Sequence, residues 1–117
     1  MVAGNTYQPE RGDLAWLDFT PHSGSEQAGR RPALILSAQE FNIATGMAFV
    51  CPITNQGKGS NFEVPLPRGA KMTGFVLTHQ LKSLDWIARE ADFAGKLNQE
   101  TLWEVFGRIE AIMSIEL

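Results

Sequence analysis

The sequence contains one cysteine, Cys51, and two isolated histidines, His22 and His79, among its 117 residues. A lone cysteine cannot form a disulfide within the chain, and this set offers no metal-ligand cluster at a recognised spacing. Its apolar runs are far shorter than the roughly 20 residues that cross a bilayer. The first residues lack the basic start and apolar stretch of a secretory signal. We therefore expect a cytoplasmic protein with no metal, no cofactor and no membrane partner.

Patterns for nucleophilic hydrolysis are also missing. The chain has no nucleophile-elbow motif, and Cys51 lies inside an apolar run, where a buried and inert thiol is expected. The Gly-rich segment 23–32 is not followed by Gly-Lys-Ser/Thr, so it does not form a phosphate-binding loop of the nucleotide-hydrolase type. Any chemistry must come from other residues.

Charge is distributed unevenly along the chain. The formal net charge is −3, which argues against a polyanionic partner at first sight. The last twenty residues, 98–117, carry this whole excess, whereas segment 26–89 has a local excess of bases. The bases of that segment are Arg30, Arg31, Lys58, Arg68, Lys71, Lys82 and Arg89. A polyanion could bind there, and scattered solvated charges are the alternative.

Short apolar segments joined by Gly- and Pro-containing connections predict a mainly β fold in a single domain, residues 1–117. Met47–Ile53 is apolar throughout and should run through the core, whereas Pro65 lacks a backbone donor and favours an edge strand. The predicted strands are Leu14–Phe19, Ala33–Ser37, Met47–Ile53, Phe62–Leu66 and Gly74–Trp86. Five or so short strands favour a small closed or nearly closed barrel.

The last twenty residues predict an amphipathic helix. Asn98 is a suitable N-cap, and Glu100 in the first turn suits the helix dipole. The apolar residues that fall on one helical face are Leu102, Val105, Phe106, Ile109, Ile112 and Met113. We expect this face to pack on the barrel. The three tryptophans, Trp16, Trp86 and Trp103, also fall where core packing is expected.

Two arginines, Arg30 and Arg31, lead into the second predicted strand. Pro32 moves Arg31 away from the helical region and so directs it toward the mouth of that strand. A guanidinium there can bind a phosphate through two parallel hydrogen bonds and stabilise charge that develops on it. The alternative is a structural arginine paired with Glu26 or Asp18.

Polar residues follow the third predicted strand. Thr54 can donate its hydroxyl to a phosphate oxygen, although threonine at a strand end is commonly only a strand former. Lys58 stands between two glycines on a loop suited to following a nucleic-acid backbone.

Six segments between about Arg11 and Arg89 occur in a characteristic order. They are Gly12-Asp-Leu-Ala-Trp-Leu-Asp-Phe, Gly24-Ser-Glu-Gln-Ala-Gly-Arg-Arg-Pro-Ala-Leu-Ile-Leu-Ser, Pro52-Ile-Thr, Lys58-Gly, Phe62-Glu-Val and Gln80-Leu-Lys-Ser-Leu-Asp-Trp. The most specific part is Gly-Ser-Glu-Gln-x-Gly-x-Arg-Pro, followed about twenty residues later by Pro-x-Thr. Together these segments closely resemble the MazF/PemK family of toxin endoribonucleases.

The resemblance implies an SH3-like barrel with helical additions, a homodimer, and metal-independent cleavage of single-stranded mRNA at short motifs. Attack of the ribose 2′-hydroxyl would leave a 2′,3′-cyclic phosphate and a 5′-hydroxyl. It implies that Arg31 and Thr54 are the main catalytic residues, with Glu26, Lys58 and Arg89 in catalysis or RNA contact. Arg30 and Lys82 add cations for RNA binding. A cognate MazE-like antitoxin, with an acidic segment that folds in the basic groove, would inhibit the enzyme.

The reaction needs a base, an acid for the leaving oxygen, and a cation for the phosphorane. An arginine is a poor base, because deprotonation near neutral pH costs several kcal/mol. We therefore expect Arg31 mainly to stabilise charge and to protonate the leaving oxygen, with Glu26 as the candidate base. Two residues depart from the family pattern, Ile87 in place of a frequent arginine and His79 in place of a frequent acid, and they leave the cut sequence open.

Two other functions compete with the nuclease. A CcdB-like toxin of similar fold binds a protein target and cleaves nothing, and fold alone does not decide between them. An SH3-like binding module should show an aromatic groove, which the spread of the three tryptophans does not favour.

Overall fold

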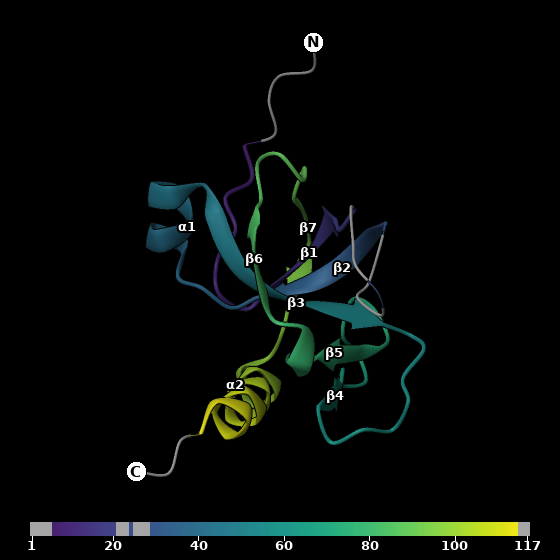
Figure 1. Ribbon diagram of the computed structural model, residues 1–117. Coiled ribbons are helices and arrows are strands. Elements are labelled where there is room, and N and C mark those ends of the chain that lie inside the picture. Colours follow the sequence, from purple (N-terminus) through teal and green to yellow (C-terminus); the bar gives the residue numbers. More distant parts are fainter. Residues whose placement is uncertain (1–5, 21–23, 25–28, 115–117) are drawn as a thin grey trace.

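The computed structural model describes residues 6–20, 24 and 29–114 of the chain. In this part a strongly curved antiparallel sheet carries one helix at each of two sides (Figure 1). The elements are β1 (Asp13–Asp18), β2 (Arg30–Ile35), α1 (Gln39–Thr45), β3 (Met47–Thr54), β4 (Glu63–Pro65), β5 (Phe75–Leu77), the 3-10 helix η1 (Thr78–Gln80), β6 (Lys82–Asp85), β7 (Asp92–Lys96) and α2 (Gln99–Met113). The predicted mainly β fold with a terminal helix is confirmed.

Strand β3 is the centre of the sheet. The order is β4-β5-β3-β2-β1-β7, and β6 pairs with β3 as well, so three strands are bonded to β3. Its side chains are mostly buried, as its uninterrupted apolar sequence predicted. The strand with Pro65 lies at one end of the order, the predicted edge position. Within the described residues β4 and β7 stand at the two ends of the order and are not paired with each other. The barrel is therefore not closed, which corrects that detail of an otherwise confirmed fold prediction.

The predicted long strand Gly74–Trp86 is divided in two. At the break, Thr78 donates its N–H and its hydroxyl to the carbonyl of Phe62, at 3.1 and 2.5 Å, instead of bonding to β3. Strand β5 before the break pairs with the end of β3, and β6 after it pairs with the beginning of β3. The two short strands therefore pair with the two ends of β3.

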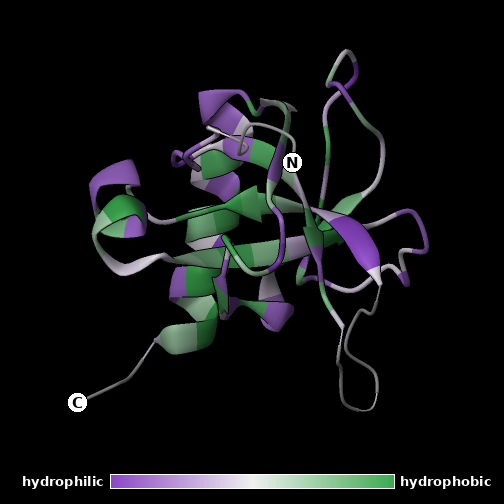
Figure 2. Ribbon diagram, turned by 90° about the horizontal axis from the view of Figure 1, so that it is seen from above, coloured by the Kyte–Doolittle hydropathy of each residue, from purple (hydrophilic) through white to green (hydrophobic). Residues whose placement is uncertain are grey.

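Alternate residues of the central strands face two different cores. Leu14, Leu34 and Cys51 pack with β4, β5 and Val105 of α2 on one face, and Ala15 packs with Val50 and other residues on the opposite face. Figure 2 shows hydrophobic residues gathered on the central strands and hydrophilic ones toward the periphery. Burial on both faces explains why β3 has no polar side.

Helix α2 begins where the sequence predicted. The Asn98 side chain accepts a hydrogen bond of 2.8 Å from the Thr101 N–H, and Val105 is fully buried. The end of the predicted apolar face is uncovered, because Ile112 and Met113 are 40% and 59% exposed. None of the helices in the described ranges combines the length and the apolar character that crossing a membrane requires.

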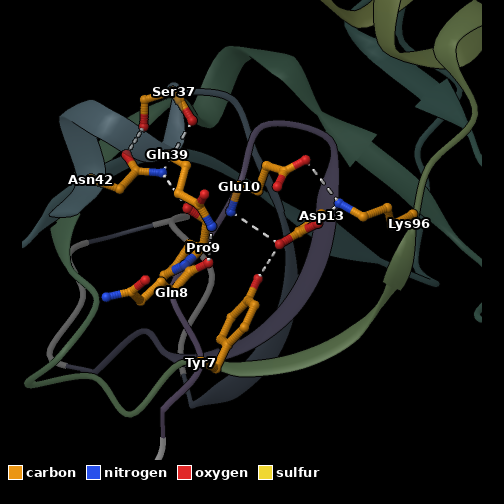
Figure 3. Close-up of polar contacts among 9 residues, drawn as sticks. All are labelled: Tyr7, Gln8, Pro9, Glu10, Asp13, Ser37, Gln39, Asn42 and Lys96. Carbon is orange, nitrogen blue, oxygen red and sulfur yellow. Dashed lines mark hydrogen bonds and ion pairs between the residues drawn. The ribbon is translucent and has the colours of Figure 1, made fainter.

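A buried carboxylate connects β1 to the N-terminal segment and to β7 (Figure 3). The Asp13 side chain is 3% exposed and accepts hydrogen bonds from the Tyr7 hydroxyl at 2.6 Å and the Glu10 N–H at 3.0 Å. Its other oxygen pairs with Lys96 Nζ at 2.6 Å. Burial, and then the bond to Asp13, raise the pKa of Tyr7. Residues 7–10 are thereby fixed to the sheet, on the side away from the strand ends described next.

Candidate active site

A pocket of about 560 Å³ lies where β1 and β3 end and β2 begins. Its lining combines apolar side chains with cations, hydroxyls and amides. The lining residues are Trp16, Arg30, Arg31, Pro32, Ile53, Thr54, Asn55, Gln56, Met72 and Thr73. An arginine pair and apolar side chains in one cavity suit a ligand that has both a phosphate and a flat apolar part.

Sheet register brings Arg31 and Thr54 together. Strands β2 and β3 pair Ala33 with Pro52, and the same antiparallel register, continued by two residues, sets Arg31 opposite Thr54. Thr54 is also paired with Phe75 of β5, so its backbone is held from a second strand. Arg31 and Thr54 therefore line one pocket although they are 23 positions apart in the sequence.

The hydroxyl of Thr54 is oriented by its own loop. Its oxygen accepts a hydrogen bond of 3.1 Å from the Gln56 N–H, and the side chain is 6% exposed. Accepting this bond uses a lone pair and leaves the hydroxyl hydrogen able to donate into the pocket. Gly74 packs against the backbone of Thr54, because a Cβ at Gly74 would approach the Thr54 carbonyl oxygen to 2.8 Å.

Arg30 and Arg89 join the pocket to the segment after β6. Arg30 donates to the Glu90 carbonyl at 2.6 Å and pairs with Asp92 at 3.1 Å. Arg89 Nη1 donates to the carbonyls of Asp18 and Thr20, each at 3.0 Å. In this arrangement both guanidinium groups hold the backbone at the rim of the pocket, and Arg30 also lines it.

Asp18, the carboxylate closest in sequence to this rim, stays charged. Hydrogen bonds from the Thr20 side chain and N–H lower the pKa of Asp18, and Arg89 and Arg30 lower it further. Cys51 shows the opposite behaviour, because burial raises the pKa of its thiol to about 12. An inert thiol was predicted at this position, and the structure agrees.

Lys58 lies on the loop after Thr54, outside the lining of the pocket. The Glu63 carboxylate, at the start of β4, is 8% exposed and accepts hydrogen bonds from the N–H groups of Lys58 and Gly59 at 2.9 to 3.1 Å. Gly57 allows the loop to lie against the Phe75 ring, since a Cβ there would approach the ring carbons to 2.7 Å. The loop that carries Lys58 thus has a defined shape, and Glu63 gives it that shape.

Comparison with known proteins assigns this arrangement to a family. Residues 10–113 match the model of the PemK-like, MazF-like toxins of type II toxin-antitoxin systems. The chain belongs to this family. It is 44% identical to the endoribonuclease toxin MazF of Escherichia coli K12 over 107 aligned residues. The alignment covers 92% of this chain and 96% of that protein. It is 40% identical to the endoribonuclease toxin ChpB of the same strain, over 89% of this chain and 93% of that protein.

Solved structures of MazF agree with this membership. MazF from Deinococcus radiodurans superposes with a TM-score of 0.89 at 42% identity and covers 93% of this chain and 99% of that one. A MazE-MazF structure from the same organism gives a TM-score of 0.83 at 37% identity, over 94% and 99% of the two chains.

Other residues predicted from the MazF/PemK pattern lie elsewhere. Lys82 of β6 places its ammonium 5.8 Å from the centre of the Phe19 ring, outside the pocket lining. Glu26, the candidate base, lies outside the described residues. His79 is exposed beside the Phe62 ring, with 5.7 Å between ring centres, and Ile87 is 64% exposed. Neither of the two departures from the family pattern lines the pocket.

The expected core packing of all three tryptophans is wrong for two of them. Trp86 is half-buried and donates from Nε1 to the Asn42 carbonyl at 2.9 Å. Trp103 is 65% exposed, and Trp16 is 41% exposed in the pocket. The sequence reasoning also missed Asn55, Gln56 and Thr73 as lining residues, and the position of Asn55 and Gln56 directly after Thr54 is the one signal that pointed to them.

Proposed function

We propose that this member of an endoribonuclease toxin family cuts single-stranded mRNA at short motifs, without a metal ion, in the cytoplasm. The ribose 2′-hydroxyl attacks the adjacent phosphate, the bond to the 5′-oxygen breaks, and the products are a 2′,3′-cyclic phosphate and a 5′-hydroxyl. The observation that carries the proposal is the convergence of Arg31 and Thr54 in one pocket.

Each of these residues has a defined task in the proposed reaction. Arg31 binds the scissile phosphate, offsets the charge of the phosphorane and donates a proton to the leaving 5′-oxygen, while Thr54 donates its hydroxyl to a non-bridging oxygen. Arg31 does not act as the base, because taking a proton from an arginine near neutral pH costs several kcal/mol. Glu26 is the candidate base for the 2′-proton. Arg30, Lys58, Lys82 and Arg89 attract and position the RNA backbone.

We also propose a homodimer that a MazE-like antitoxin inhibits. Phe41 and Phe49 are 40% and 42% exposed, with ring centres 5.8 Å apart, and Phe49 borders an apolar pocket of about 220 Å³ with Phe106 and Ile109. Monomeric proteins rarely expose an apolar surface of this kind to water, and a second copy of the chain, related by two-fold symmetry, would cover it. The relatives whose structures contain MazE support the antitoxin as the partner of this chain.

The test of the nuclease is incubation of the purified chain with a long RNA in EDTA, followed by sequencing of the new 5′ ends. Arg31→Ala should lower kcat about 10²- to 10³-fold, and Thr54→Val about 10- to 10²-fold. Arg68→Ala, which changes an exposed arginine outside the pocket, should cleave like the wild type. If the RNA stays intact and the chain binds a gyrase-type protein target, the result favours the CcdB-like alternative.

The base assignment has its own test. A carboxylate base makes the cleavage rate rise with pH as the carboxyl group loses its proton, and Glu26→Gln should abolish this rise. Near-normal cleavage by Glu26→Gln, together with an inactive Arg31→Ala, would show that another group takes the proton.

A further inference from the structure

Trp16 occupies an unusual position for a tryptophan in a small β protein. It is the one exposed residue of β1, whose other residues are buried or half-buried. An indole ring represents a large apolar area, and leaving 41% of it in water gives up much of the free energy that its burial would supply. Such exposure inside a pocket indicates a ligand surface rather than a packing residue.

The sheet explains why this ring is uncovered. Trp16 points to the same face as Leu14, because side chains two positions apart in a strand share a face. Leu14 is fully buried beneath β4, β5 and α2, but these elements do not reach the end of β1. Cross-strand pairing sets Trp16 opposite Pro32, the residue after Arg31. The indole therefore continues the apolar core face into the pocket that contains the cation.

The remaining apolar lining completes a surface for a flat group. Ile53 and Met72, which both belong to the core beneath, line the same pocket as Trp16 and Pro32. Arg31 and Thr54, the residues proposed to bind phosphate, line this pocket as well. A nucleotide has this same division, with a charged phosphate on one side and a base whose faces are apolar on the other.

We propose that Trp16 is a stacking platform for one unpaired nucleobase adjacent to the scissile phosphate. The inference rests on the proposed function and adds the contact that selects a base released from pairing. Stacking of a base on an aromatic side chain contributes about 1–3 kcal/mol, which corresponds to about 5- to 150-fold in affinity. The contact is made before and during the reaction, so its loss raises KM and leaves kcat nearly unchanged.

The test is a double-mutant cycle between protein and RNA. An oligonucleotide with the cut motif is prepared as a series in which one nucleotide at a time, on either side of the cut, is replaced by an abasic ribose. KM and kcat are measured for the wild type, Trp16→Phe, Trp16→Ala and Trp103→Ala. Trp103 is the matched control, an exposed tryptophan on α2 outside the pocket.

We expect Trp16→Ala to raise KM about 5- to 150-fold, Trp16→Phe to keep most of the affinity, and Trp103→Ala to match the wild type. At one flanking position the abasic ribose should weaken the wild type by a similar factor and should not weaken Trp16→Ala further. Additive losses at every position would overturn the proposal, as would a loss confined to kcat. A lower molecular mass of Trp16→Ala in solution would also overturn it, because the ring would then contact a second copy.

The same series with a 2′-deoxyribose at the cut position separates this proposal from the proposed function. Fluorescence anisotropy then measures affinity where no cleavage is possible. If the wild type binds the series and cuts no RNA, the nuclease fails while the stacking result still stands or falls on the affinities.

Discussion

The buried carboxylate of Glu63 should control the affinity for RNA through the loop that carries Lys58. Two consecutive N–H groups, of Lys58 and Gly59, donate to this carboxylate at 2.9 to 3.1 Å. A hydrogen bond to a charged group contributes about 1.5–3 kcal/mol and one to a neutral group about 0.5–1.5 kcal/mol. In Glu63→Gln the amide oxygen can still accept, but each bond loses about 1 kcal/mol, and the new NH₂ group faces an N–H donor.

The expected loss of unfolding free energy in Glu63→Gln is therefore about 2–3 kcal/mol. For a domain of this size this corresponds to a fall in Tm of roughly 8–12 °C. Urea unfolding and a thermal melt measure it directly, and Glu110→Gln, at an exposed position of α2, is the control that should unfold like the wild type.

Cleavage kinetics test the link to Lys58. We expect KM of Glu63→Gln to rise about tenfold, and the slope of log affinity against log salt to fall by about 0.7, the value for one lost contact to single-stranded RNA. Lys58→Ala should show the same two changes, and the double variant should show no larger ones. A wild-type salt slope in a folded Glu63→Gln, or additive effects in the double variant, would refute the reasoning.

Three further predictions concern other parts of the fold. Gly74→Ala should lower both Tm and kcat, because its φ of +132° is unfavourable for alanine and the new Cβ would press on the Thr54 carbonyl; a variant with wild-type kcat would contradict this. Phe49→Glu should convert the proposed dimer into a monomer, measured by light scattering against the wild type, and an unchanged mass would exclude this surface. Cys51 holds its proton to about pH 12 in the fold, whereas an unfolded thiol loses it near pH 9, so stability should fall as pH rises through this interval. Urea unfolding of wild type and Cys51→Ala at pH 8 and pH 10 measures the difference, and equal losses in both would contradict it.

Much of the strand content could be predicted because it follows from local patterns. The continuous apolar run of β3 indicated a central strand, Pro65 indicated an edge, and Asn98 indicated the start of α2, as the structure shows. The helix α1 was missed because Phe41 and Ile43 alternate along it with polar or small residues, a pattern typical of a strand, and both are exposed in the structure. Strand β7 was missed because it is short and contains Gly95.

The candidate site could be predicted only in part, for a different physical reason. The sequence indicated that Arg31, before Pro32, and Thr54, at the end of an apolar strand, lie at strand ends. Whether the two residues lie close together depends on the register of β2 against β3, which the hydrogen bonds of the folded sheet determine. Arg30 and Arg89 donate to backbone carbonyls more than 55 positions away, and Arg30 also pairs with Asp92. No sequence pattern reveals these partners. The exposure of Trp16 depends equally on how far β4, β5 and α2 extend over the sheet.

The position of the pocket therefore depends on where β4, β5 and α2, the elements that cover one face of the sheet, end. Val64, Val76 and Val105 cover the sheet face at the cross-strand pair Leu14 and Leu34. The pair Trp16 and Pro32 lies two positions further along the same two strands, toward the pocket. Had the covering elements reached two residues further, they would have buried the indole and closed the pocket around Arg31. A domain of this size has a small hydrophobic core, so leaving the strand ends uncovered lowers its stability. At the other end of β1, the Asp13 carboxylate pairs with Lys96 at 2.6 Å and helps to offset this loss. On this reasoning an Asp13→Asn variant should unfold more easily yet keep the KM of the wild type, which separates the stability of β1 from the chemistry at its far end.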